Sequence, residues 1–152
     1  MPAFERAAEL YRRLGDGRGQ AQAAFWIGCV HQVIRRDDTS AVPELEHARL
    51  LAAQADDKGT EAEALRHLGI AAHTAGRLDE ARAHLEESSR LRRLIGNLAG
   101  VAANMVGLAY IAVAQGRPAD ATVILDEAHD LAAAQQAFAV VGQIAEARVA
   151  IR

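Results

Sequence analysis

Six histidines are the residues of this chain with the clearest potential for metal binding or acid–base chemistry. His67 and His73 lie six positions apart, so they project from different faces of a helix and cannot share a metal ion. His84 and His129 stand close to carboxylates, a spacing that is routine for solvent-facing pairs on helices. Neither a His-Glu-x-x-His nor a Cys-x-x-Cys motif occurs. The sequence therefore predicts no metal site and no cofactor.

Cys29 is the only cysteine, and pairing with His31 or His73 would be needed to make it a nucleophile. Residues 29 and 31 face apart on a helix, however, and no local motif suggests an oxyanion hole. Lone cysteines are among the most buried residues, which favours a thiol in the core or lining a groove. One cysteine also fits a reducing, cytoplasmic compartment. A cysteine-dependent hydrolase ranks last among the functions considered, and the sequence predicts a protein that is not an enzyme.

Glycine-rich and basic segments do not indicate nucleotide or nucleic-acid binding. The segment 15–19 follows no strand and lacks the lysine of a P-loop. The arginine pairs at 12–13, 35–36 and 92–93 are short, and the formal net charge is −3. Because nucleic-acid binding requires a basic surface, neither DNA nor RNA is an expected partner. The longest apolar runs are short and alanine-rich, which argues against a membrane span.

The elements that must position these side chains repeat every 40 residues. Ala41 aligns with Ala81 and Ala121 when the sequence is shifted by this length, and three further sets follow at the spacing of one helix face. Those sets are Leu45, Leu85 and Leu125; Ala48, Ser88 and Ala128; and Leu51, Leu91 and Leu131. A preceding stripe, Leu65, Leu68 and Ala72, recurs as Met105, Leu108 and Ala112. Each repeat therefore contains two amphipathic helices.

The first repeat differs from the others in length. Its first helix lies 41 rather than 40 residues before its counterpart, so we expect the turn from Arg35 to Ser40 to be one residue longer than the others. Thr39 or Ser40 is the expected N-cap of the helix that follows, with Pro43 in the tolerated first turn. The equivalent turns contain Gly76 and Gly116, which suit a left-handed helix end.

Eight helices and no strands are predicted, which makes the chain all-α. Alanine forms nearly a quarter of the 152 residues and aromatics only 4%, a composition typical of closely packed helices. The expected helices span residues 3–14, 18–35, 41–55, 60–75, 78–95, 98–115, 118–134 and 137–151. No linker separates domains, so the chain is expected to form one continuous array.

The middle unit resembles the tetratricopeptide repeat family. The stretch from Leu65 to Ala72, then Gly76, Ala81 and Leu85, matches the family's pattern of large, Leu-Gly and small residues. The family's proline near the end of the second helix is absent, and the unit is longer than the usual length of about 34 residues. The segment 85–97 resembles the repeat arrays with longer units that occur in bacterial transcriptional regulators and signalling ATPases.

The resemblance implies an α-solenoid of antiparallel helix pairs, a superhelix whose first helices line an inner face that binds peptides or proteins. The implied divisions are a half repeat at 1–16, repeats at 17–57, 58–97 and 98–136, and a capping helix at 137–152. The groove residues that it implies are Gln22, Phe25, Cys29, Gln32, Glu63, Arg66, Ile70, His73, Val106, Tyr110 and Val113.

The two ends of the array are expected to differ. Residues 3–14 look like a second helix whose first helix is missing, which indicates either a piece of a longer protein or pairing with another copy. The capping helix is expected to cover the third repeat with Val141, Ile144, Ala145 and Val149.

These features predict a non-catalytic protein- or peptide-binding scaffold, in the interaction or sensory part of a bacterial cytoplasmic regulator of transcription or signalling. The alternative is a self-association module that forms a homodimer through the N-terminal half repeat. No membrane partner is expected.

Overall fold

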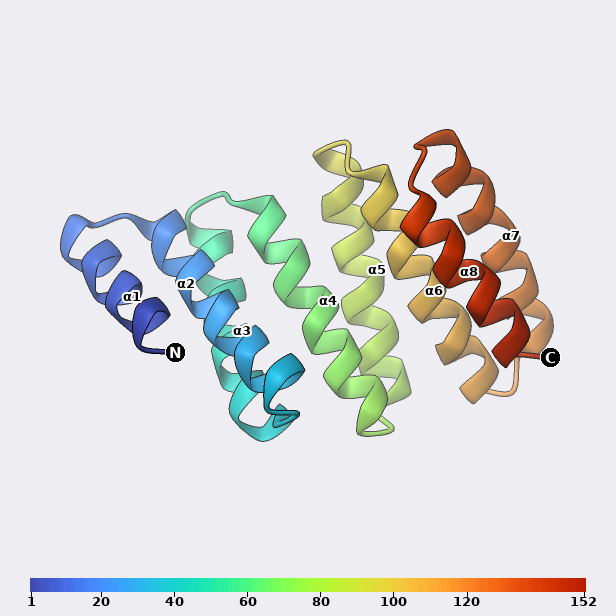
Figure 1. Ribbon diagram of the computed structural model, residues 1–152, viewed down its shortest axis with the longest axis horizontal. Coiled ribbons are helices and arrows are strands. Elements are labelled where there is room, and N and C mark those ends of the chain that lie inside the picture. The colour runs from blue at the N-terminus through green and yellow to red at the C-terminus, as the bar shows by residue number, and fades with distance from the viewer. The chain divides into compact units, whose positions relative to one another are not determined.

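The computed structural model describes residues 1–152, and all its regular structure is helical. The helices are α1 (Pro2–Leu14), α2 (Gly17–Cys29), the π-helical segment η1 (Val30–Ile34), α3 (Asp38–Gln54), α4 (Lys58–Thr74), α5 (Leu78–Leu94), α6 (Leu98–Ala114), α7 (Pro118–Ala134) and α8 (Phe138–Ala150) (Figure 1). The predicted class, an all-α chain of eight helices arranged in consecutive pairs, is confirmed.

A left-handed residue in each turn sets the spacing of the helices. Positive φ angles occur at positions 36, 56, 76, 96, 116 and 136, twenty residues apart. Glycine, which adopts this conformation without steric cost, occupies three of these positions, and Arg36, Asp56 and Gln136 occupy the others. The left-handed ends expected at Gly76 and Gly116 are confirmed. A repeat of 40 residues is therefore two helix–turn units of equal length.

The extra residue of the first repeat lies in the helix, and the prediction of a longer turn was wrong. The Arg35 N–H donates to the carbonyl of Val30 at 3.1 Å, the five-residue step of a π-helix. The Asp37 N–H bonds to the carbonyl of His31, six residues back, whereas the equivalent bond from Asp57 reaches only five residues back, to Ala52. The insertion is thus absorbed by one wide helical turn.

The N-cap of α3 is Asp37, so the expectation of Thr39 or Ser40 was wrong. One Asp37 carboxylate oxygen accepts from the Ser40 N–H at 3.1 Å and the other accepts from the Ser40 hydroxyl at 2.5 Å. These bonds keep the pKa of Asp37 below its usual value, because they favour the carboxylate. An aspartate caps the start of a helix well because it satisfies free N–H groups and its charge suits the helix dipole.

Two compact units, Met1–Ala71 and Ala72–Arg152, make up the chain. In the first unit, α2, α3 and the first part of α4 share a core. Small residues allow the close approach: a Cβ on Gly28 would meet the Leu45 side chain at 2.8 Å. Tyr11 of α1 covers Gly19 of α2 and leaves no room for a Cβ there. The core residues are Ala24, Phe25, Cys29, Ala41, Leu45, Ala48, Ala64 and Leu68.

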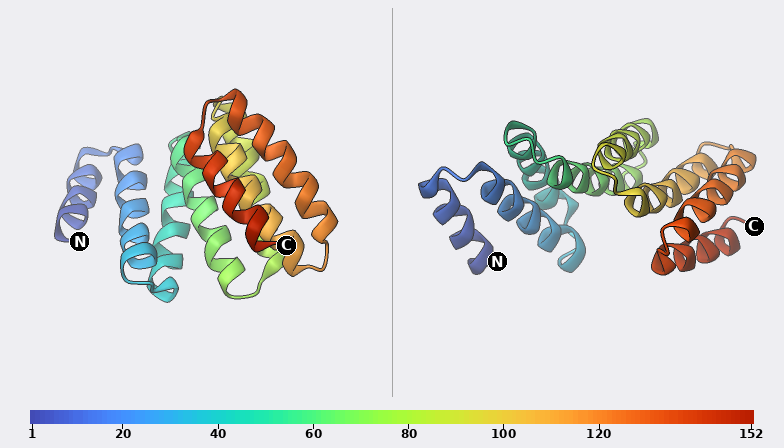
Figure 2. Two further views of the ribbon diagram at one scale, coloured as in Figure 1. Left: turned by 45° about the vertical axis from the view of Figure 1, so that its right-hand side comes forward. Right: turned by 90° about the horizontal axis from the view of Figure 1, so that it is seen from above.

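In the second unit, α6, α7 and α8 lie side by side (Figure 2). The last helix buries Ile144 and Ala147, whereas Ala145 and Val149 are exposed. The expected stripe of the capping helix is therefore wrong for these two exposed residues. Because α8 contacts both α6 and α7, its buried face is rotated toward Val140, Ile144, Ala147 and Ile151.

A buried polar cluster distinguishes the α5–α6 pair from the other pairs. Asn104 is fully buried, and its Nδ2 donates to the hydroxyls of Ser88 at 2.9 Å and Ser89 at 3.2 Å. Forty residues earlier and later the counterparts of Asn104 are Ala64 and Ile144. Since a buried amide requires hydrogen-bond partners, the serines and the asparagine depend on one another.

The left-handed turn residues give a direct test of this architecture. We expect Gln136→Gly to stabilise the protein by roughly 0.5–1 kcal/mol, because glycine removes the steric cost of a positive φ. The melting temperature, followed by circular dichroism, should rise by about 2 °C. Gln135→Gly is the matched control, since its φ of −91° suits any residue and glycine there adds only freedom to the unfolded chain. A lower melting temperature for both variants would contradict the assignment.

Candidate functional site

The potentially reactive side chains of the first unit lie close together where α2, η1 and α4 meet. Asp16 starts α2 by accepting from the Gly19 N–H at 2.9 Å, and the helix then directs Phe25 and Cys29 inward. His67 of α4 lies opposite, with its Nε2 3.9 Å from the Cys29 sulfur. The sequence offered His31 or His73 as the partner of this thiol, and neither is the histidine found there.

Gln32 of η1 fixes the ring of His67. Its Oε1 lies 2.5 Å from His67 Nδ1, and its Nε2 donates to the His67 carbonyl at 3.0 Å and to Asp38 at 3.2 Å. Because an amide oxygen only accepts, Nδ1 carries a proton, and the other ring nitrogen, Nε2, faces Cys29.

Burial, together with the smaller effect of the nearby Glu63 carboxylate, which disfavours a second negative charge, raises the pKa of the Cys29 thiol to about 12. A nucleophilic cysteine needs the opposite environment, with a lowered pKa and a neighbouring cation. At neutral pH Cys29 is therefore a neutral thiol.

A row of rings extends from His67 to the first helix. Phe25 packs edge-on against His67, with centroids 5.5 Å apart, and edge-on against Trp26 at 5.2 Å. Trp26 in turn stacks with Phe4 of α1 at 6.3 Å. This arrangement fixes α1 to α2 through aromatic contacts, since no residue of α1 is fully buried.

The rings and the π-helical segment enclose one side of an open pocket of about 630 Å³. Its walls are mainly apolar, and Glu63 is the only carboxylate among them. The lining residues are Phe4, Phe25, Trp26, Cys29, Val30, Val33, Ile34, Glu63 and His67. We refer to it as the aromatic pocket.

The aromatic pocket contains three of the predicted groove residues, Phe25, Cys29 and Glu63. A fourth predicted groove residue, Gln32, does not line the pocket but hydrogen-bonds to His67, which does. Gln22 is exposed on α2. Arg66 and Ile70 follow on α4, and Ile70 is exposed. In the second unit, Val106 is buried, and Tyr110 and Val113 pack on the core while His73 is half-buried. A groove formed by all eleven residues stays a prediction.

Sequence reasoning missed Phe4, Trp26, His67 and the π-helical residues as parts of the pocket. A signal was present in the Phe25–Trp26 pair and in the apolar residues near Val33. Helical periodicity could not predict that α1 lies against α2, because that placement depends on the packing of aromatic rings.

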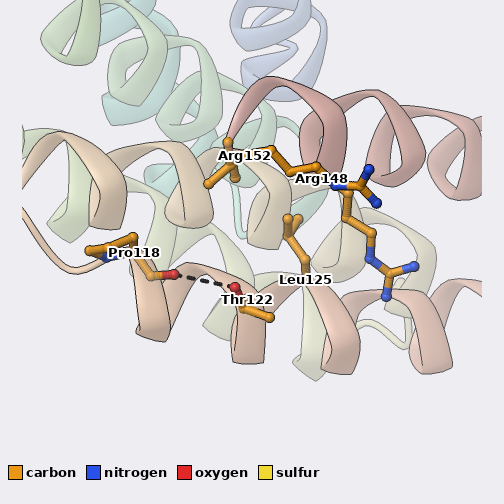
Figure 3. A pocket seen from close by; sticks show the side chains of 6 residues that line it. Pro118, Thr122, Leu125, Arg148 and Arg152 are labelled. Atoms are coloured by element: carbon orange, nitrogen blue, oxygen red, sulfur yellow. Dashed lines mark hydrogen bonds between the residues drawn. The ribbon is translucent and has the colours of Figure 1, made fainter.

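A second, smaller pocket of about 280 Å³ lies between α7 and α8. Figure 3 shows Pro118, Thr122 and Leu125 on its α7 side and Arg148 on α8. The Thr122 hydroxyl donates to the Pro118 carbonyl at 3.3 Å, and Arg148 bonds to Asp126 at 2.7 Å. Because the guanidinium already has a carboxylate partner, this pocket is a poor anion site.

No group of three or more histidine, cysteine, aspartate or glutamate side chains is placed to hold a metal ion. None of the helices combines the length and apolar character needed to span a bilayer.

Pairs of helices that recur with one length and one turn geometry define a helical-repeat protein. Residues 60–134 match the sequence profile described as Tetratricopeptide repeat and belong to that family, whose members serve as scaffolds for protein–protein interaction. Regulatory protein AfsR of Streptomyces griseus is 30% identical over 128 residues. That alignment covers 82% of this chain but 13% of the length of that relative.

The environment of Cys29 predicts low reactivity. Near pH 8, iodoacetamide should modify native Cys29 about a thousandfold more slowly than the same cysteine in the guanidinium-unfolded chain, because thiolate is the reactive form and is scarce at a pKa of about 12. The modified fraction is measured by mass spectrometry over time. Cys29→Ser combined with Val123→Cys places a thiol at an exposed position and should react at the unfolded rate. Fast labelling of native Cys29 would contradict a buried neutral thiol.

Proposed function

We propose that this chain is a non-catalytic module that binds a protein or peptide through the first helices of its repeats. The observation that carries this proposal is the aromatic pocket, which opens on α2 and α4 and includes Phe25, Cys29 and Glu63. Exposed aromatic and aliphatic surface beside a few polar groups is typical of an interaction site.

The chemistry of the same side chains supports a binding role over a catalytic one. The thiol of Cys29 is protonated and lies 3.9 Å from His67 Nε2, and Gln32 holds the other ring nitrogen of His67. A cysteine hydrolase requires a thiolate and an imidazolium instead. The cysteine-hydrolase alternative therefore lacks its reactive species at neutral pH.

We further propose that the module is the interaction or sensory part of a bacterial cytoplasmic regulator of transcription or signalling. The support is the likeness to a protein described as regulatory, of which this chain spans only a small part. In such a regulator, a partner that binds the array would bias its state through differential contacts.

Self-association is a second candidate, and one observation favours it. The first helix buries none of its residues fully, and Leu10 and Leu14 are exposed to 57% and 77%. Two copies could cover these leucines by pairing their N-terminal half repeats, since large apolar side chains at a surface favour burial.

Substitution on the first helices should separate binding from folding. The Gln22→Ala, Ile70→Ala double variant removes two exposed side chains, so partner capture by the immobilised chain should fall at least about fivefold while the melting temperature stays within about 2 °C. The control is Leu50→Ala with Val123→Ala, which trims exposed side chains on second helices. The captured protein is quantified by mass spectrometry. Equal capture by both variants would contradict recognition through first helices.

Light scattering after size exclusion tests self-association. A homodimer held by α1 should dissociate when Leu10→Ser and Leu14→Ser are combined, because both side chains lose their apolar contacts. A wild-type mass equal to the monomer across a hundredfold range of concentration would exclude this second candidate.

A further inference from the structure

The aromatic pocket concentrates the large rings of a chain that has few. Three of the six aromatic residues, Phe4, Phe25 and Trp26, line it. Trp26 is 51% exposed, and the neighbouring Val33 and Ile34 of the π-helical segment are 59% and 74% exposed. Apolar side chains with this much accessible surface around a cavity are available to a ligand.

The pocket has an acidic side chain in its wall. Glu63 is its only carboxylate, and no lysine or arginine is among its lining residues. Glu63 and Cys29 both line the pocket, so the carboxylate lies at the pocket wall. The faces of aromatic rings also attract cations. An anionic group is therefore disfavoured here and a cation is favoured.

The size of the pocket admits more than one side chain. Its volume of about 630 Å³ lies within the range of about 300–1,000 Å³ typical of ligand sites. A lysine or arginine has an aliphatic stem that packs on apolar walls while its charged end stays near water or a carboxylate. Glu63 is half-buried among apolar lining residues, so one pocket offers both the apolar surface for such a stem and the carboxylate for its charged end.

We propose that the aromatic pocket binds a peptide segment that carries a lysine or arginine beside a large apolar residue, with the apolar groups against Trp26 and Ile34 and the cation toward Glu63. This inference rests on the proposed function and names the chemistry of its partner. Glu63 contributes its negative potential.

Trp26 is the only tryptophan, so its fluorescence reports on this pocket alone. The full chain is titrated with three peptides, acetyl-Ala-Leu-X-Leu-Ala-amide, in which X is arginine, glutamine or glutamate. We expect the arginine peptide to bind about fivefold tighter than the glutamine peptide, and the glutamate peptide to bind most weakly. Raising the salt concentration should reduce the difference, because charge attraction is screened.

Two variants test the assigned roles. Glu63→Gln keeps the shape of the side chain and should reduce the arginine-to-glutamine ratio to about one, whereas Glu61→Gln on the same helix should preserve it. Ile34→Ala should weaken all three peptides by about the same factor, whereas Val123→Ala in the second unit should not. Circular dichroism confirms that each variant is folded.

Equal affinities for the three peptides, tightest binding of the glutamate peptide, or an unchanged ratio in Glu63→Gln would each overturn the inference. So would tighter binding of hexylammonium than of the arginine peptide, which would assign the pocket to a small amine. No change in Trp26 emission with any peptide would overturn it too, yet the capture experiment with Gln22 and Ile70 would still decide the proposed function. Equal capture by the first-helix and second-helix variants, with intact peptide selectivity, would instead contradict recognition through the first helices and leave the peptide preference of the pocket standing.

Discussion

Each turn of this array ends a helix by placing one residue in the left-handed region, and the packing of the following helix depends on that turn. The position recurs at intervals of twenty residues, at Gly76, Gly96 and Gly116 and also at Asp56 and Gln136. Because α3 to α7 all have 17 residues, equivalent side chains meet equivalent partners in successive pairs. Small residues at those contacts, such as Ala41, Ala81 and Ala121, can then be fully buried in every repeat.

The π-helical segment is the one place where this regular spacing is broken, and it lies at the aromatic pocket. The additional residue widens the turn that follows α2 and leaves Val33 and Ile34 exposed beside the rings. It also carries Gln32, which orients His67. Wide helical turns of this kind are often found at functional sites, because they redirect side chains that a regular helix would point elsewhere.

Helical periodicity was sufficient to predict most of the fold. The recurring alanines and leucines predicted the helix pairs because their burial depends only on which face of a helix they occupy, as Leu45, Leu85 and Leu125 show. The count of residues also revealed an insertion in the first repeat. It could not show whether a turn or a helix takes that residue, since both choices leave Leu45 on the same face.

The candidate site was less predictable because it depends on contacts between elements. Phe25 and Cys29 were identified from helix position, but Phe4 and His67 join them only through the way α1 and α4 pack on α2. The state of the Cys29 thiol likewise follows from burial and from the Glu63 charge, neither of which is visible in a motif.

The cluster of Asn104, Ser88 and Ser89 has a consequence for how such arrays evolve. Genes that encode repeats gain and lose units by unequal recombination, which is harmless when neighbouring units are interchangeable. Replacing the helix that carries Asn104 by one with alanine or isoleucine there would leave two buried hydroxyls without their amide partner. The α5–α6 pair is therefore a matched pair, and neither helix can be exchanged for its counterpart from another repeat without loss of these hydrogen bonds.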